Sequence, residues 1–380
     1  MGSLEYSLEA ALTLSRLKPE LHACFGVQSS MEYSLQGAGL EYSLEAALTL
    51  SRLKPELQTL RDYGVNRTLI DFPHILTCLR GLMRIGINDA TSSSCWVADG
   101  GWGTEFQKIG LEPRSSPDPW NLFHPEKVSR VARSYVDAGA HIILTNTFGG
   151  NRFVLARHNL EDRLEEVNRR GAELSREAAG NRALVFGSMG PTGKRLQTGE
   201  ITEEEVFDSY RRQAEALWRG GVDALLIETM IDVGEMKIAA RAARASTPLP
   251  VALSMSFDSG KEKTQTIMGV SPEQAVVEME EAGAWMVGAN CGLGPELYVR
   301  VCGRMRAVTS RPVWVKPSAG IPQMVGTEIA YPQRPDAFAS FALQLREAGA
   351  NVIGGCCGTG PDHIKRLVAV LASQSSVRKH

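Results

Sequence analysis

The chain has 380 residues, which is enough for one large domain or two of ordinary size, each with a buried core. Its 41 basic and 43 acidic residues nearly cancel and form no long run of one sign, which excludes the basic footprint of a nucleic-acid-binding protein. Seven scattered cysteines do not fit a secreted disulfide scaffold, and no early segment is apolar enough for a signal peptide or a membrane span, so we expect a cytoplasmic protein without membrane association.

The first part of the chain contains an internal duplication. Residues 4–21 recur without change as residues 40–57. Leucine and alanine recur at helical spacing within each copy, and Pro19 would end the first helix. A solenoid needs three or more stacked repeats, so two identical copies indicate a tandem duplication or an over-extended start. We therefore expect residues 1–93 to form a short, weakly structured helical extension outside the core.

From Cys95 onward, short β-branched runs alternate with helical patterns. The eight runs are Cys95–Asp99, His141–Asn146, Leu184–Met189, Ala224–Glu228, Val251–Phe257, Trp285–Asn290, Val313–Lys316 and Val352–Gly355. The helical patterns are Pro125–Ala138, Glu161–Ala179, Thr202–Gly220, Ser271–Ala282 and Pro361–Ala372. Eight such units predict an α/β fold, a (β/α)8 TIM barrel over residues 94–375 with a tail at 376–380. An open doubly wound sheet is the alternative, which the count of eight disfavours.

Cysteines follow two of these predicted strands, at the end of the barrel where TIM-barrel chemistry is built. Cys291 follows the sixth run, and Cys356 and Cys357 follow the eighth, between glycines that let the backbone bend. Three soft thiolates with an open fourth position fit a catalytic zinc site. The alternatives for the adjacent pair are two small buried residues or a vicinal disulfide.

Such a metal site would suit a substrate that carries a thiol. A thiol that enters the fourth position is deprotonated, and the thiolate is the nucleophile. Three cysteine ligands around a divalent ion carry a net charge of about −1, which leaves electron density on the incoming sulfur. The sequence therefore predicts alkylation of a substrate sulfur rather than hydrolysis.

Two carboxylates end predicted strands and indicate an amino-acid substrate. Asp99 precedes the glycine turn at Gly100 and Gly101, whose backbone N–H groups could hold a carboxylate, and Glu228 ends the fourth run. Together they could bind the ammonium and carboxylate of an amino acid, and Asn290 is a further polar candidate. The alternative is that Asp99 caps the next helix and Glu228 pairs with an arginine.

Six motifs follow one another along the predicted barrel: Asp99–Glu105, Thr145–Asn151, Gly187–Gly193, Glu228–Thr229, Gly288–Cys291 and Gly354–Thr359. Together they resemble the homocysteine S-methyltransferase family, which includes the homocysteine-binding barrel of cobalamin-dependent methionine synthase and the betaine–homocysteine methyltransferases. The resemblance covers roughly residues 95–373, and the double-cysteine motif is highly specific.

The resemblance implies a barrel with zinc on Cys291, Cys356 and Cys357, and homocysteine held through Asp99 and Glu228. It also implies methyl transfer to the homocysteine sulfur, which forms methionine. Because the chain ends at His380, we expect no folate or cobalamin module, so either a small onium donor binds directly or a separate corrinoid protein supplies the methyl group. A non-catalytic zinc- or thiol-binding barrel is a further alternative.

Two departures from the family bear on the methyl donor. Ser318 stands where relatives often carry asparagine. Animal betaine enzymes surround the quaternary ammonium with aromatic rings, yet here glycine follows Phe148 and threonine follows Glu228. Trp102, Trp120 and Phe148 are the remaining aromatic candidates for a donor site.

Overall fold

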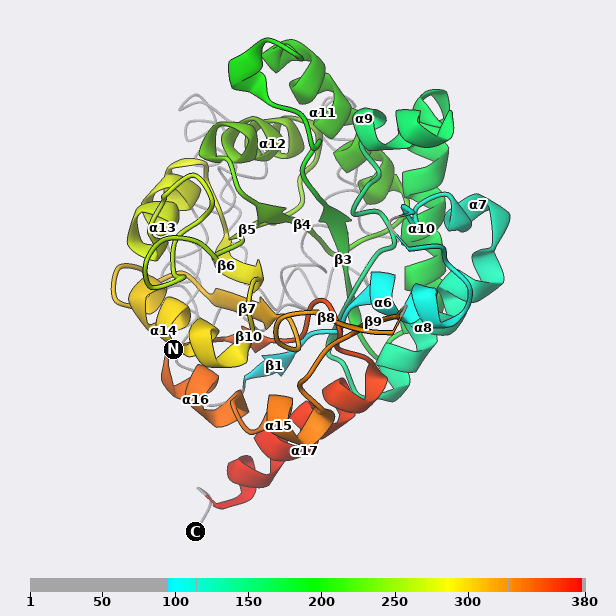
Figure 1. Ribbon diagram of the computed structural model, residues 1–380. Helices are drawn as coiled ribbons and strands as arrows, with labels where there is room; N and C mark the ends of the chain where they lie inside the picture. The colour runs from blue at the N-terminus through cyan, green and yellow to red at the C-terminus, as the bar shows by residue number, and fades with distance from the viewer. Residues whose placement is uncertain (1–94, 114, 327, 378–380) are drawn as a thin grey trace, which may run out of the picture. The chain divides into compact units, whose positions relative to one another are not determined.

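The computed structural model describes residues 95–377, apart from residues 114 and 327. The duplicated segments at 4–21 and 40–57 lie outside the described residues, and so does the whole predicted extension at 1–93. Strands surround the centre of the described part and helices lie outside them (Figure 1).

Eight parallel strands make up the main sheet, in the order β1-β10-β7-β6-β5-β4-β3-β2. They are β1 (Trp96–Val97), β2 (Ile142–Leu144), β3 (Leu184–Met189), β4 (Ala224–Met230), β5 (Val251–Met255), β6 (Met286–Cys291), β7 (Val313–Pro317) and β10 (Val352–Ile353). The two ends of this order meet, because Ala98 bridges Ile142 in parallel and the His141 N–H donates to Val97 O at 2.8 Å. The sheet thus closes on itself, which confirms the predicted barrel and contradicts the open sheet.

Helices alternate with these strands. They are α6 (Trp102–Lys108), α7 (Trp120–Phe123), α8 (Pro125–Asp137), α9 (Arg152–Leu155), α10 (Leu164–Ala179), α11 (Glu203–Arg219), α12 (Val233–Ser246), α13 (Pro272–Glu281), α14 (Pro295–Arg306), α15 (Pro335–Ala339), α16 (Ala342–Glu347) and α17 (Pro361–Val377), with 3-10 turns at Ala156–His158, Glu161–Arg163 and Leu196–Thr198. A capping box begins α11, since the Thr202 hydroxyl accepts from the Glu205 N–H and the Glu205 carboxylate accepts from the Thr202 N–H. None of the described helices is both long and apolar enough to cross a bilayer.

An antiparallel hairpin interrupts the alternation after β7. It consists of β8 (Gln323–Val325) and β9 (Glu328–Ala330). The sequence did not predict it, because three-residue strands leave no clear period. Met324 and Ile329 on the hairpin are exposed.

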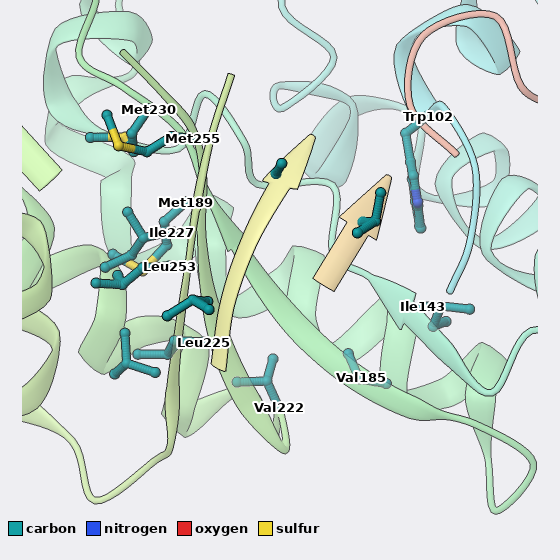
Figure 2. Packing of buried hydrophobic residues seen from close by; sticks show 14 of the residues in the cluster. Trp102, Ile143, Val185, Met189, Val222, Leu225, Ile227, Met230, Leu253 and Met255 are labelled. Atoms are coloured by element: carbon teal, nitrogen blue, oxygen red, sulfur yellow. The ribbon is translucent and has the colours of Figure 1, made fainter. Parts of the chain in front are cut away.

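Side chains alternate along the strands between two apolar layers. Those that point into the barrel form one cluster, which includes Phe186, Leu226 and Trp314. Those that point outward pack against the helices in a larger cluster, part of which Figure 2 shows around Leu225 and Leu253. The inward layer plugs the barrel with buried hydrocarbon, so polar groups gather beyond it at the C-terminal ends of the strands.

Candidate active site and metal centre

The three cysteines predicted to share a metal ion lie together. The Sγ atoms of Cys291, Cys356 and Cys357 are all within 4.8 Å of one another. The sulfurs of the adjacent pair are 4.0 Å apart, about twice the length of a disulfide bond, so the vicinal-disulfide alternative is wrong. Two sulfurs that each lie about 2.3 Å from one tetrahedral ion are about 3.8 Å apart. The cluster therefore fits a metal ion of zinc's size and softness.

The end of β7 holds these cysteines in place, because β7 lies between β6 and β10. Three backbone hydrogen bonds of 2.8–2.9 Å join them: from Cys356 N–H to Pro317 O, from Ser318 N–H to Cys291 O, and from Ala319 N–H to Cys357 O. The Ser318 hydroxyl also lies 3.8 Å from Cys291 Sγ. The residue at the position of the family's asparagine thus contacts a sulfur of the cluster.

Two strand ends near the cluster adopt a strained backbone. Cys291 has φ 69° and Thr229 has φ 59°, in the left-handed region that costs a non-glycine residue about 1–3 kcal/mol. Hydrogen bonds hold both strand ends, because the Thr229 N–H donates to Asn290 Oδ1 at 2.8 Å and the Tyr298 hydroxyl donates to Asn290 O at 2.7 Å. The surrounding structure therefore maintains the strain that orients the Cys291 side chain.

The glycine turn after β1 packs directly against the double-cysteine loop. A Cβ at Gly101 would lie 2.4 Å from Cys356 O, and one at Gly100 would lie 2.6 Å from Thr359 O. The Gly101 N–H donates to Thr359 O at 2.8 Å, so this N–H is not free to hold a substrate carboxylate. The structure instead gives Gly101 a close-packing position, while Gly100 remains a predicted binding position.

The three sulfurs share protons with one another. Hydrogen bonds from Cys356 and Cys357 lower the pKa of Cys291 to about 3. The hydrogen bond with Cys291 raises the pKa of Cys356 well above its usual range and that of Cys357 to about 11. The cluster thus carries one negative charge readily, and a metal ion would take the place of the shared protons.

The other described cysteines, half-buried Cys95 and buried Cys302, behave as ordinary thiols. Burial raises the pKa of both Cys95 and Cys302 to about 12, and their sulfurs lie near backbone carbonyls. Both are free, and neither belongs to the cluster of three sulfurs. Cys24 and Cys78 lie outside the described residues.

Glu228 is buried at the end of β4 with two neutral partners. Its Oε1 accepts from the Ser188 hydroxyl at 2.6 Å, and its Oε2 accepts from the Asn290 amide at 3.3 Å. Burial raises the pKa of Glu228, and the charge of Lys316 opposes this rise. No described arginine pairs with Glu228, so that alternative is wrong.

Asp99 is fully buried, and its carboxylate has three partners. Oδ1 lies 2.5 Å from Lys316 Nζ, while Oδ2 accepts from the Trp102 indole at 2.6 Å and from the Leu144 N–H at 2.7 Å. It does not cap α6, whose N-cap is Gly101. Asp99 therefore links three strands and a helix, a role that the sequence did not predict.

The aromatic donor candidates lie in different surroundings. Trp102 is almost buried and already donates to Asp99. Lys127 Nζ lies 4.3 Å from the centre of the Trp120 ring, so a cation already occupies one face of that ring. Phe148 is 41% exposed and packs against Gly190. Of the three, Phe148 is the most accessible ring.

Several residues of the site were not predicted. Ser188, Ser254 and Lys316 point into the barrel, and the alternation of the strands is the signal that could have found them. Tyr331 follows the hairpin and forms a hydrogen bond with Cys357, and burial raises its pKa. Tyr331 also lines a cavity of about 750 Å³ between α6 and the hairpin. No local sequence pattern could have predicted Tyr331 as a site residue, because it reaches the cysteine cluster only through the fold of the hairpin before it.

Comparison of the chain with protein families and with other proteins identifies its relatives. The homocysteine S-methyltransferase family model matches residues 96–371. Methionine synthases from Mycobacterium leprae and Mycobacterium tuberculosis are each 32% identical, over 73% and 75% of this chain. This chain spans only 24% and 25% of their length.

Solved structures of the homocysteine methyltransferase MmuM from Escherichia coli, in oxidized and metallated forms, have a TM-score of 0.62 with this chain. They are 23% and 24% identical, and the match covers 77% of this chain and 99% of theirs. This likeness supports the barrel fold. The family model covers most of the chain, and the cysteine cluster lies inside the matched range, so the protein belongs to the homocysteine S-methyltransferase family.

Proposed function

We propose that the protein transfers a methyl group to the sulfur of homocysteine and so forms methionine, with zinc held by Cys291, Cys356 and Cys357. The observation that carries this proposal is the cluster of three sulfurs within 4.8 Å at the end of a barrel of this family. A bound zinc ion would keep the thiol of the substrate as a thiolate near neutral pH.

The residues around the cluster would bind and orient the amino-acid part of the substrate. Glu228 offers a buried carboxylate with only neutral partners, which suits the ammonium of homocysteine. Asn290 holds Glu228 and the strained Thr229 together through its side-chain amide. Fixing the ammonium in this way would place the thiol over the cysteines, and proximity of the reactants contributes much of the rate in such reactions.

The transfer itself is a displacement at carbon. An electron pair of the homocysteine sulfur forms the new sulfur–carbon bond, while the bond from the methyl group to its donor breaks and leaves its pair on the donor. The proton of the homocysteine thiol passes to water.

The methyl donor is either a small onium compound or a methylcorrinoid. The resemblance to methionine synthases, of which this chain spans about a quarter, favours the second source. We place the protein in a reducing compartment such as the cytoplasm, because the three sulfurs bind a metal only when reduced.

Turnover by the purified full chain tests the proposal. Homocysteine would be supplied with betaine, S-methylmethionine, S-adenosylmethionine or methylcobalamin in turn, and methionine would be measured. We expect Cys356→Ser to lose bound zinc and turnover, and Cys302→Ser, which removes a buried thiol outside the cluster, to keep both.

A Cys356→Ser variant with full zinc content and full activity would contradict the assignment of the metal site. Tight homocysteine binding without methyl transfer from any donor would favour a non-catalytic thiol-binding barrel instead.

A further inference from the structure

Lys316 is a lysine buried inside the barrel. It is 2% exposed and lies on β7, in register with Asn290 of β6. Its side chain passes Gly354, where a Cβ would lie 2.9 Å from Lys316 Cγ. The glycine that precedes the double-cysteine motif thus leaves room for this lysine.

The Lys316 ammonium keeps its charge although it is away from water. Burial lowers its pKa, but the negative charges around it, chiefly those of Asp99 and Glu228, and the hydrogen bond to Asp99 together raise the pKa above its usual range. Removing an ammonium from water costs several kcal/mol unless a partner compensates. The partner in hydrogen-bond contact is Asp99, at 2.5 Å.

Because of this pair, the two carboxylates at the strand ends are not equivalent. Asp99 accepts hydrogen bonds from a cation and two neutral donors, and a carboxylate has room for about four in all. Glu228 accepts only from the Ser188 hydroxyl and the Asn290 amide. The charge of Asp99 is balanced, whereas the charge of Glu228 has no partner in direct contact.

We propose that Lys316 is a positioning residue that holds Asp99 as its counter-ion, so that Glu228 alone attracts the ammonium of the substrate. Lys316 acts through Asp99 and does not touch the reacting atoms. This inference rests on the proposed function, and it assigns the predicted ammonium contact to Glu228 rather than to both carboxylates. The pair also orients Trp102, whose indole donates to the other Asp99 oxygen.

A double-mutant cycle on Lys316→Met and Asp99→Asn tests this arrangement. Each single substitution leaves a buried charge without its partner, so kcat/KM for homocysteine is expected to fall at least about tenfold. The double variant has no unpaired charge. Its kcat/KM is expected to be at least about tenfold higher than the value obtained when the two single fold-losses are multiplied together. Additive losses would overturn the proposal, because Asp99 would then act on the substrate independently of Lys316.

Two further measurements separate this inference from its alternatives. Homocysteine binding without a donor, measured by calorimetry, is expected to weaken at least about tenfold in Glu228→Gln, while 4-mercaptobutyrate, which lacks the ammonium, is expected to bind both forms alike. Equal weakening for both thiols would overturn the role of Glu228 as the ammonium site. If the wild-type protein binds neither thiol, the proposed function fails as well.

The unfolding midpoint of every variant distinguishes a local effect from a loss of folding. Glu273→Gln is the matched control, because it breaks a half-buried ion pair with Arg304 on the outer helices, away from the site. It is expected to leave kcat/KM unchanged. Lys316→Met could lose activity only because its unfolding midpoint falls, and the double variant could then fail to recover kcat/KM. In that case the role of Lys316 would be structural only and the proposal would fail.

Discussion

Asp118 is a buried carboxylate whose ionisation should destabilise the protein. It lies between α6 and α7, is fully buried, and accepts from the Ser116 hydroxyl through Oδ2. Its Oδ1 is a buried atom without a hydrogen-bond partner among the described residues. Burial raises the pKa of Asp118 from 3.8 to about 6. We therefore expect Asp118→Asn to change how stability depends on pH.

The size of the effect follows from the change in pKa. A rise of about two units corresponds to about 3 kcal/mol, at about 1.4 kcal/mol per unit. The folded state holds the proton more tightly than the unfolded state. The contribution of Asp118 to stability is thus fully present below pH 3.8 and is lost as the pH rises through about 6. At neutral pH the ionised group costs about 3 kcal/mol.

Urea unfolding of the wild-type chain and the Asp118→Asn variant between about pH 4.5 and 7.5 measures this cost. Asparagine does not titrate, so the variant should gain about 2 kcal/mol relative to wild type across this range. The side-chain amide of the Asp118→Asn variant would leave buried N–H groups unpaired, which lowers the unfolding free energy by about 1–3 kcal/mol at every pH. This constant difference does not affect the change with pH. A difference between the two proteins that stays constant across the range would refute the reasoning.

Three other predictions concern the site and its supports. Gly101→Ala places a Cβ 2.4 Å from Cys356 O, so we expect lower zinc content and at least about a tenfold loss of kcat/KM, while Gly103→Ala, which meets nothing within 4 Å, should keep both. Burial lowers the pKa of His363, whose Nδ1 accepts from the Gly360 N–H. The contribution of His363 to stability is therefore present above about pH 6.5 and is lost as the pH falls through the lower pKa of the folded state. His363→Asn should flatten the dependence of the unfolding free energy on pH in this range, and an unchanged slope would count against this prediction. Removal of zinc with a chelator should abolish methionine formation but keep the far-ultraviolet circular dichroism, because the eight-stranded barrel closes through its own hydrogen bonds; loss of the barrel signal would show that the metal is needed for folding.

The repeated pattern of the chain was sufficient to predict the barrel and the cysteine cluster. Each strand appeared as an apolar run, and parallel strands bring their C-terminal ends together whatever lies between them. Cys291 and the pair at 356–357 could therefore be placed at one site although about 65 residues separate them. The strand boundaries were less accurate. The first run was predicted over Cys95–Asp99, whereas β1 covers only Trp96–Val97, although single hydrogen bonds continue the pairing as far as Asp99, whose N–H donates to Ile142 O and whose carbonyl accepts from the Gly355 N–H.

The partners of each polar side chain could not be predicted from the sequence. Asp99 and Lys316 are 217 positions apart, and no local pattern joins them. The hairpin that carries Tyr331 to the cluster was also missed, since its strands have three residues each. Such contacts depend on how far each strand is shifted along its neighbour, which the apolar pattern of a single strand does not contain.

The sequence can show which polar side chains point into the barrel above the apolar plug, but it cannot show which of them contact one another. Ser188, Glu228 and Lys316 each lie two residues after an inward apolar residue, namely Phe186, Leu226 and Trp314. The period of two alone could have assigned all three to the layer above the apolar plug. Which carboxylate the lysine neutralises depends on the strands beside β7. In the order of the sheet, β10 and then β1 follow β7, and Asp99 lies just after β1. The order of the strands therefore brings Lys316 to Asp99, and it leaves Glu228 as the carboxylate without a cation in direct contact, which is the one we propose for the substrate ammonium.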